Sequence, residues 1–458
     1  MAAIMTNRRA ILLTAGLAAL LTIAARAEAP RIYAITGTRI VTSAGAPIEN
    51  GTLVFRNGFI EAVGASVAAP ADARIIDGKG LTVYPGLIDM GSSAGLDVPT
   101  PPRPAVAGTR EDIERWKRQV ILRPEIEAAD YVKADSPDLK RLAAAGITSI
   151  LAVPPGPVVR GRSSLLNVAA ADDEPQYGNI ADERRGLYVI RTPVALHVAF
   201  PERTAGDAYP ESLMGVTAFV RQAFLDAAHY QAEHAFYDRV KRAETRPVYD
   251  RALEAMQPAL AGVVPVVFEA NEFREILRSL GMAREFKLRA VIAGGHGADE
   301  AIADLKADKA RVLFSLDYPV RPGTLAPDAD EPLRTLRLRA RAPAVPSALA
   351  RAGIPFAFES AGLKEPNYFV RNAAKAVKAG LSPDAAIRAM TLDAATIAGV
   401  GDRLGSIEKG KIANLVVTEG DLFDEKMTIR HVFVDGRLLV LEPAAAPQTP
   451  RRGRPGGS

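Results

Sequence analysis

The sequence contains no cysteine among its 458 residues, and it has a single tryptophan and five histidines. The absence of cysteine excludes disulfide bonds, thiolate metal sites and cysteine nucleophiles. A large excess of one charge is also absent, because 57 basic and 53 acidic residues leave a net charge of +4. Part of that charge lies in residues 443–458, which are rich in proline, glycine and arginine and which we expect to be a disordered tail. No basic run is interleaved with aromatic residues, so we predict no nucleic-acid partner.

Residues 1–27 have the pattern of an export signal. Arg8-Arg9 precede a short apolar stretch over residues 11–23, and Ala25-Arg26-Ala27 fits a small-x-small cleavage site. The paired arginines resemble a twin-arginine signal without its usual phenylalanine. A membrane anchor is the alternative, but crossing a bilayer requires ~20 apolar residues. We therefore expect an exported, periplasmic or extracellular protein that begins near residue 28 and has no membrane contact after cleavage.

Both ends of the remaining chain contain short β-type runs separated by turn dipeptides. Asn50-Gly51 and Asn57-Gly58 fall within residues 31–82, and Asp435-Gly436 falls within residues 403–440. Each dipeptide is typical of a β-hairpin when strand residues flank it. We therefore predict that the two segments together form one small composite β-sandwich domain.

The middle of the chain, residues 83–402, alternates between strand-length apolar runs and amphipathic helical patterns. Continuous apolar strands between such helices indicate a parallel sheet that is buried on both faces. The number of units favours a (β/α)8 TIM barrel, an α/β fold, over a doubly wound open sheet. Residues 211–260 form one long helical pattern, which we predict to be an insertion packed against the barrel, with an active-site lid as the alternative. The apolar runs cover residues 147–153, 188–200, 263–269, 289–294, 312–317 and 355–359.

Three segments resemble the amidohydrolase superfamily, and together the resemblance covers essentially all of residues 31–440. They are IDGKGLTVYPGLIDM over residues 76–90, the stretch over residues 369–417 that ends in GKIANLVV, and IRHVFVDGR over residues 429–437. Inner segments resemble an exported bacterial subgroup near the imidazolonepropionase-like members, several of which have lost metal ligands. The resemblance implies a composite β-sandwich beside a (β/α)8 barrel, with the active site at the carboxyl ends of the barrel strands.

The resemblance also implies a metal site for the hydrolysis of C–N bonds, and other residues fill most of its ligand positions here. The family carries His-x-His after strand one, a lysine or acid in mid-barrel, histidines after strands five and six, and an aspartate after strand eight. Here Gly91 and Ser93 fall on the two strand-one positions, Glu269 on the strand-five position and Ala361 on the strand-eight position. His296 lies near the strand-six position. No mid-barrel lysine is identifiable. Zinc or a similar divalent metal is expected for the family, but catalytic zinc normally has three protein ligands, so no cofactor is assigned.

The polar residues that remain at the predicted strand ends are the candidate catalytic groups: Glu269, His296 and Glu359. A carboxylate that points into a barrel mouth costs desolvation unless it is paired. Glu269 is therefore either a pocket residue or part of a salt bridge, and Glu359 faces either inward or outward. His296 follows two glycines in a loop and is either a ligand or a hydrogen-bonded structural histidine.

Ser93, Arg160 and Arg162 are the candidate substrate-binding residues. The two arginines belong to a loop after strand two and could hold a substrate carboxylate with two hydrogen bonds each; a solvated loop is the alternative. Ser93 would act as a nucleophile only beside a base, and no such pair is identifiable in the sequence. His197 alternates with apolar residues in ALHVAF, which predicts a core histidine.

Three functions agree with these residues. The first is hydrolysis of cyclic amide-type C–N bonds at a reduced metal site, with weak or absent activity. The second is a pseudoenzyme, a non-catalytic barrel that binds a small molecule or supports an intact exported homologue. The third is a metal-free enzyme that uses Glu269, Glu359 and His296 as acid–base groups. The fold alone does not choose between them. We expect a small-molecule ligand and leave open a homo-oligomer or a pair with an intact amidohydrolase.

Overall fold

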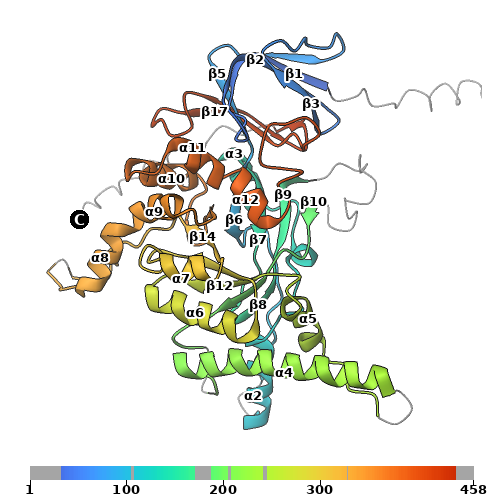
Figure 1. Cartoon of the computed structure of the whole chain (residues 1–458), viewed down its shortest axis with the longest axis vertical. Helices are drawn as coiled ribbons and strands as arrows, with labels where there is room; N and C mark the ends of the chain where they lie inside the picture. Colours follow the sequence, from blue (N-terminus) through green and yellow to red (C-terminus); the bar gives the residue numbers. More distant parts are fainter. Residues whose placement is uncertain are drawn as a thin grey trace, which may run out of the picture.

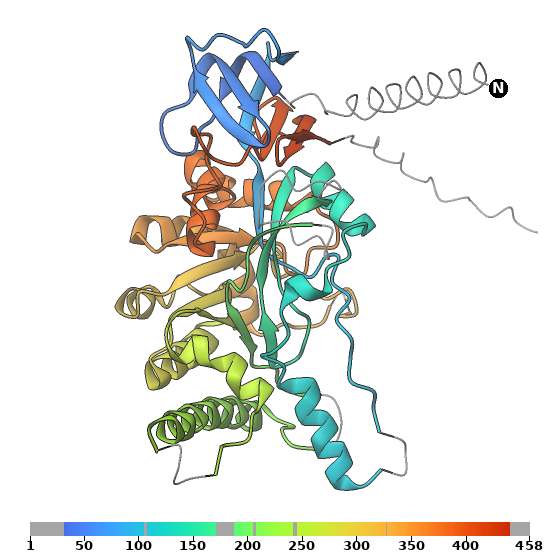
Figure 2. The same cartoon turned by 90° about the vertical axis from the view of Figure 1, so that its right-hand side faces the viewer.

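The computed structural model describes residues 32–104, 108–170, 187–204, 208–240, 245–326 and 328–439. The predicted export signal and the predicted tail lie outside these residues. A small sheet domain sits at one end of the molecule, built from the blue and red ends of the described chain (Figure 1). The strands and helices of the middle segment lie below it, and the long helix α4 (Leu213–Val240) lies at the far end (Figure 2).

The end domain is one eight-stranded sheet to which both ends of the described chain contribute. Its order is β18-β17-β16-β5-β1-β2-β3, and β4 pairs with β1 beside this path. The two ends meet where β16 pairs antiparallel with β5, from Leu415 opposite Pro85 to Glu419 opposite Leu81. The prediction that this domain has two packed layers stays a prediction. The strands are β1 (Ile32–Ile40), β2 (Ile48–Arg56), β3 (Phe59–Gly64), β4 (Arg74–Asp77), β5 (Leu81–Pro85), β16 (Leu415–Glu419), β17 (Thr428–Val434) and β18 (Arg437–Leu438).

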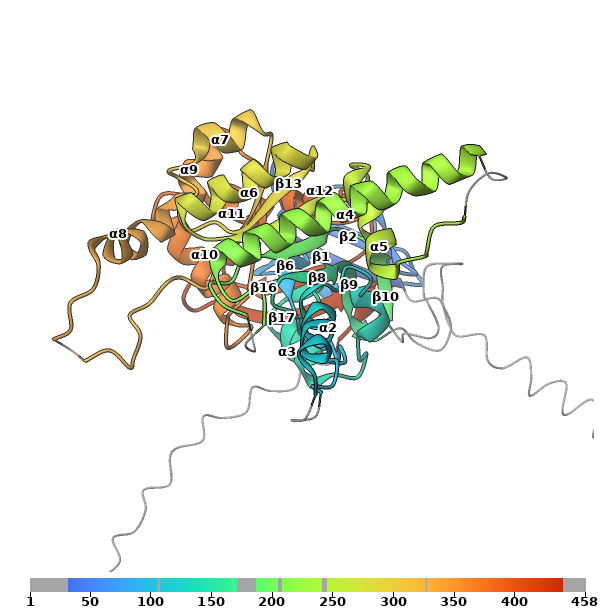
Figure 3. The ribbon, with the colours of Figure 1, turned by 90° about the horizontal axis from the view of Figure 1, so that it is seen from below.

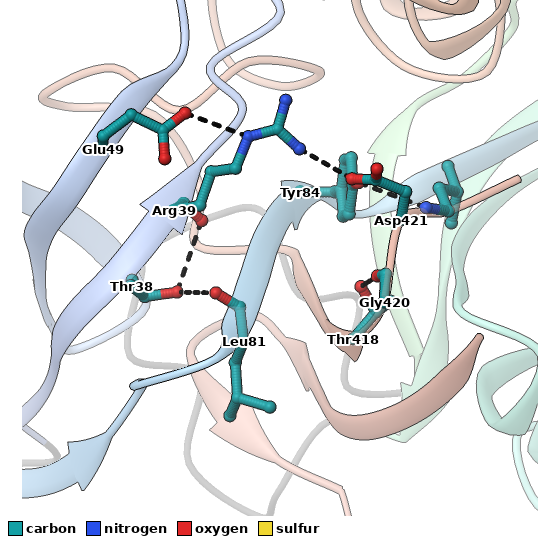
Figure 4. A network of polar contacts seen from close by, with 9 residues as sticks. Thr38, Arg39, Glu49, Leu81, Tyr84, Thr418, Gly420 and Asp421 are labelled. Carbon is teal, nitrogen blue, oxygen red and sulfur yellow. Dashed lines mark hydrogen bonds and ion pairs between the residues drawn. The ribbon is translucent and has the colours of Figure 1, made fainter. Parts of the chain in front are cut away.

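Arg39 links three segments of this domain. Its Nε donates to Glu49 on β2 at 3.1 Å, and its guanidinium contacts Asp421, just after β16, at 2.7 Å (Figure 4). Beside it, the Tyr84 hydroxyl accepts the backbone N–H of Leu422 at 3.2 Å. Exposed ion pairs contribute little free energy. The apolar cluster beneath them, which includes the T-shaped Phe55–Phe433 pair, therefore supplies most of the stabilisation between the two chain ends.

Two of the three hairpin predictions are confirmed. Asn57-Gly58 joins β2 to β3, and Asp435-Gly436 joins β17 to β18. The prediction of a turn at Asn50-Gly51 is wrong, because both residues lie inside β2. Asn50 has a φ of 51°, and the register of β2 against β1 shifts on both sides of the Thr38–Gly51 pair. The dipeptide therefore makes a bulge, which uses the same left-handed backbone as a turn.

The middle segment contains two hydrogen-bonded sheets that share one bent strand. The first has the order β10-β9-β7-β6 and the second β15-β14-β13-β12-β11-β8. β8 and β9 are separated only by Ser163, so the chain pairs antiparallel with β11 before this residue and with β7 after it. The strands are β6 (Leu87–Ser92), β7 (Ile147–Ala152), β8 (Val159–Arg162), β9 (Ser164–Ala170), β10 (Leu187–Arg191), β11 (Leu196–Ala199), β12 (Val266–Ala270), β13 (Ala290–Gly294), β14 (Arg311–Ser315) and β15 (Phe356–Glu359).

β6 and β15 lie next to each other, but no β-ladder joins them in the described part of the chain. One backbone hydrogen bond crosses between them, from Ala361 N to Gly91 O at 3.0 Å. The carboxylate of Asp89 accepts the N–H groups of Gly91 and Ser360, which a ladder would otherwise use. The prediction of mixed α/β strand–helix units is confirmed from β11 to β15, which are parallel. The predicted closed, all-parallel (β/α)8 barrel differs from the described structure in two ways. β8 and β9 pair antiparallel with their neighbours, and no ladder joins β6 to β15.

Helices cover the sheets of the middle segment. α6 (Phe273–Phe286) begins at a capping box between Glu272 and Glu275 and ends at Lys287, which has the left-handed conformation. α4 crosses the end of the molecule and α8 projects to one side (Figure 3). None of the helices within the described ranges has the length and apolar character needed to cross a bilayer. The remaining helices are α2 (Arg110–Ile121), α3 (Pro137–Ala144), α5 (Arg251–Leu260), α6 (Phe273–Phe286), α7 (Ile302–Ala307), α8 (Leu333–Arg341), α9 (Val345–Ala352), α10 (Tyr368–Lys378), α11 (Pro383–Ala389) and α12 (Leu392–Ala398).

Within the predicted insertion, α4 packs against α5 and α6. Phe224 contacts Phe286 with ring centroids 5.2 Å apart, and Gln257 of α5 donates to the backbone of Ala227 at 2.9 Å. Met214, which the sequence pattern places on the same apolar face, is 84% exposed. Met214 lies in the first turn of the helix, and the buried face begins at Val216.

Candidate functional site

A cavity of about 500 Å³ lies where the carboxyl ends of several strands of the middle segment meet. Its size suits a small-molecule ligand, because ligand pockets usually measure ~300–1,000 Å³. All three candidate catalytic residues and one of the two candidate arginines line it. The polar lining residues are Ser92, Ser93, Arg160, His197, Glu269, Asn271, His296, Ser315, Asp317 and Glu359.

The seam between β6 and β15 borders the cavity through Gly91, Ser92 and Glu359, and Asp89 lies fully buried in this seam without lining the cavity. Asp89 accepts three hydrogen bonds, from the Ser360 hydroxyl at 2.5 Å, the Ser360 N–H at 2.8 Å and the Gly91 N–H at 3.1 Å. Burial raises the pKa of Asp89 to about 6, and these hydrogen bonds oppose the rise. Asp89 was not among the predicted residues, although a lone carboxylate within an apolar strand was an available signal.

Glu359 ends β15 and faces inward, which settles the two orientations left open by the sequence. Its Oε1 accepts the Gly294 N–H at 2.8 Å, and a β-carbon added to Gly91 would lie 2.5 Å from Oε2. The carboxyl group therefore fills the space that any side chain at position 91 would need. Burial first, and then the nearby Asp89, raise the pKa of Glu359 well above its usual range. The shift favours the protonated form of the carboxyl group.

The two candidate arginines have different surroundings. Arg160 on β8 lines the cavity and forms an ion pair with Glu269 on β12. Arg162 does not line the cavity; it lies 3.2 Å from Glu127 in a second ion pair. The position of Arg162 therefore lends no support to a substrate-binding role. Residues two apart on a regular strand face the same side, but the register of β8 against β11 shifts between Gly161 and Val159, and Gly161 has a φ of 126°, which breaks the alternation between the two arginines. Glu269 has both of its predicted features, a place in the cavity and a salt bridge.

Two histidines line the cavity, although only His296 was predicted there. His296 Nε2 is 3.1 Å from the Ser315 carbonyl, so this ring has the hydrogen bond of a structural histidine. His197 lies on β11 and is 5% exposed, and its Nε2 has no hydrogen-bond partner within the described residues. Burial, followed by the positive charge of Arg160, lowers the pKa of His197 to about 3, so the ring is neutral. The prediction of a core histidine is right about burial and misses its place beside the cavity.

The residues present do not fit the metal site that the resemblance implies. Gly91 offers no ligand atom, and the Glu359 carboxyl occupies the space beside it. Ser93 and Ala361 line the cavity but supply no carboxylate or imidazole, and Glu269 is engaged with Arg160. Across the described ranges, no group of three or more histidine, aspartate or glutamate side chains is arranged to hold a metal ion. We therefore derive no chemical step through a metal.

Comparison with known proteins identifies the family. The model of the Amidohydrolase family matches residues 192–439, more than half of the chain, and the protein belongs to this family. An imidazolonepropionase from Aromatoleum aromaticum is 29% identical over 385 residues, which cover 80% of this chain and 85% of that protein. The amidohydrolase tasK from Hapsidospora irregularis is 24% identical over 411 residues. These residues cover 86% of this chain but only 40% of tasK, so the chain spans about two fifths of that relative's length.

Solved structures show the same fold. A crystal structure of an amidohydrolase from Thermotoga maritima aligns with a TM-score of 0.69 at 23% identity, covering 90% of this chain and all of that one. A Xaa-Pro dipeptidase with bound methionine aligns with a TM-score of 0.51 at 14% identity, covering 89% of this chain and 99% of that one. At these identities the likeness is one of fold, and it establishes a TIM-barrel-type architecture with mixed α/β content.

Proposed function

We propose that this protein binds a small amide-type compound in the cavity, and that metal-dependent hydrolysis of cyclic amide-type C–N bonds is weak or absent. The observation that carries the proposal is the position of Glu359. Its carboxyl group fills the space beside Gly91, where the family resemblance implies a metal-binding histidine. An intact metal site at this place would require both a different residue at position 91 and a different position of the Glu359 side chain.

The remaining cavity supports binding. It is concave and largely preformed, since hydrogen bonds hold Glu359, Asp89 and His296 in place. Its polar groups are few and converge on one volume, as in sites that orient a small ligand. The imidazolonepropionase relative, whose name indicates a substrate with a cyclic amide-type ring, supports a ligand of similar chemistry.

The test combines metal content with ligand binding. The mature protein, residues 28–458, is loaded with zinc or manganese, desalted and subjected to elemental analysis, and cyclic amides and acyl-dipeptides are titrated by calorimetry. We expect far less than one ion per chain, saturable binding of at least one compound, and no turnover that depends on metal. Near one or two ions per chain, together with metal-dependent turnover, would refute the proposal.

We further propose that the protein is exported by the signal over residues 1–27 and acts outside the cytoplasm as a homo-oligomer or beside an intact amidohydrolase. The basic pair Arg8-Arg9, the apolar stretch and the small-x-small site support export. Intact mass of the protein from the periplasm and medium should give a chain that begins near Glu28. A full-length chain confined to the cytoplasm would contradict export. Self-association is tested by sedimentation at several concentrations, and the presence of monomer alone would contradict it.

A further inference from the structure

The cavity has more acidic groups than basic ones. Three carboxyl groups, those of Glu269, Asp317 and Glu359, line it against the single guanidinium of Arg160. Arg160 is already paired with Glu269. Over the described ranges, neither Asp317 nor Glu359 forms an ion pair. A cavity with unbalanced carboxyl groups favours a ligand of positive charge and disfavours an anion.

The cavity also has hydrogen-bond acceptors that lack donors. Glu359 Oε1 is bonded to Gly294, but Oε2 has no hydrogen-bond partner among the residues that the structure describes. His197 Nε2 is buried and unpartnered, as is Asn271 Oδ1, and both residues line the cavity. Buried polar atoms without partners cost free energy, which a ligand with several N–H groups would recover. The Nε of Arg160 is also unpartnered, but Glu269 balances the charge of its guanidinium.

From these two observations we infer that the ligand of this cavity carries a cationic nitrogen group, an amidinium or an ammonium, which Glu359 and Asp317 receive. The inference rests on the proposed function, because it requires the cavity to bind a small molecule in place of a metal. An amidinium presents two parallel N–H donors that match a carboxylate, and a neutral His197 ring accepts a further N–H.

Binding of a cation changes the protonation of Glu359. The positive charge favours the carboxylate form of Glu359 and so opposes the rise in its pKa that burial causes. Other titratable or charged groups line the cavity or lie beside it, and they also act on the protonation of Glu359. They are Asp89 from β6, Arg160 from β8, His197 from β11, Glu269 from β12, and His296 and Asp317 from the segments after β13 and β14.

The experiment compares three probes of one shape that differ in charge: benzamidinium, benzamide and benzoate. Each is titrated calorimetrically into the mature protein in two buffers of different ionisation enthalpy, which gives the affinity and the number of protons released. The variants are Glu359→Gln, which is isosteric, and Asp317→Asn. Glu419→Gln is the matched control, because Glu419 ends β16 in the end domain as Glu359 ends β15.

We expect benzamidinium to bind about tenfold or more tightly than benzamide, as charge-assisted hydrogen bonds allow, with benzoate the weakest. Any proton release should accompany the binding of benzamidinium and not that of benzamide or benzoate. The preference should shrink in Glu359→Gln and Asp317→Asn and persist in Glu419→Gln. If the Glu359 variant does not fold, Asp317→Asn still decides, since Asp317 is exposed.

Three results would overturn the inference. Equal or tighter binding of benzamide refutes the cationic ligand and leaves the proposed binding function intact. An unchanged preference in both cavity variants removes Glu359 and Asp317 as the receiving groups. Stoichiometric zinc uptake, with no binding of any probe, would overturn the inference and the proposed function together.

Discussion

The contact between Gly91 and Glu359 predicts that Gly91→Ala destabilises the fold. The new β-carbon would lie 2.5 Å from Oε2, 3.0 Å from Cβ and 3.3 Å from Cδ of Glu359. Neither partner can move easily. Glu359 is held by the Gly294 N–H, while the Gly91 N–H is bonded to Asp89 and its carbonyl to the Ala361 N–H. Overpacking of a fixed core site typically costs ~1–3 kcal/mol, and we expect about 2–3 kcal/mol here.

A double-mutant cycle separates this clash from other effects. The free energy of unfolding is measured by urea denaturation for the parent, Gly91→Ala, Glu359→Ala and the double variant. The Glu359→Ala variant loses the carboxyl group but keeps the Cβ that would lie 3.0 Å away, so we expect Gly91→Ala to cost about 1–2 kcal/mol less in this background, which is the coupling energy. Gly281→Ala in α6 is the control; its β-carbon meets nothing within 4 Å, and it should stabilise by roughly 0.5–1 kcal/mol. Additive costs for positions 91 and 359 would refute the reasoning.

Three further predictions concern pH, metal and domain structure. The raised pKa values of Asp89 and Glu359 mean that the folded state holds more protons, so the free energy of unfolding should fall as pH rises from about 4 to above 6. The Asp89 shift alone, from 3.8 to about 6, corresponds to ~3 kcal/mol, and urea denaturation of Asp89→Asn at stepped pH should lack that part of the slope. Glu269→Ala and His296→Ala should remove no zinc-dependent turnover; a robust activity lost in either variant would contradict the degenerate site. A fragment of residues 31–82 should stay unfolded by circular dichroism without residues 403–440, because β5 needs β16; a stable, monodisperse fragment would disprove this.

The strands of the middle segment were predictable because they are continuous apolar runs between amphipathic helices. The predicted runs over residues 289–294 and 355–359 differ from β13 and β15 by a single residue at one end. Local signals failed where two structures share one pattern. Asn50-Gly51 is equally typical of a turn and of a bulge. No local pattern around Ser163 predicted that β8 and β9 form one bent strand.

The composition of the site was predictable only in part. Glu269, His296 and Glu359 were identifiable because strand-end polar residues gather at one edge of a parallel sheet. The direction of the His197 side chain was not predictable from the sequence. Both sides of a buried strand are apolar, so alternation alone does not show which side borders the cavity. The close approach of Gly91 and Glu359 joins residues that are far apart in the chain, and no local pattern encodes it. Asp317 ends the predicted run over residues 312–317 and carried the same strand-end signal, but it was not named as a candidate; in the structure it follows β14, which ends at Ser315.

The seam between β6 and β15 joins the chemistry of the cavity to the integrity of the barrel. Elsewhere backbone ladders hold neighbouring strands together, whatever the side chains are. At this seam Asp89, Ser360 and one backbone bond do so, and their neighbours Gly91, Ser92 and Glu359 line the cavity. Hydrogen exchange at Gly91, Ser360 and Ala361 should therefore slow when a ligand fills the cavity, since binding and strand closure are thermodynamically linked. A substitution in this seam therefore changes both the wall of the cavity and the contact between β6 and β15. The ligand specificity of the cavity and the rigidity of the two strands cannot change independently.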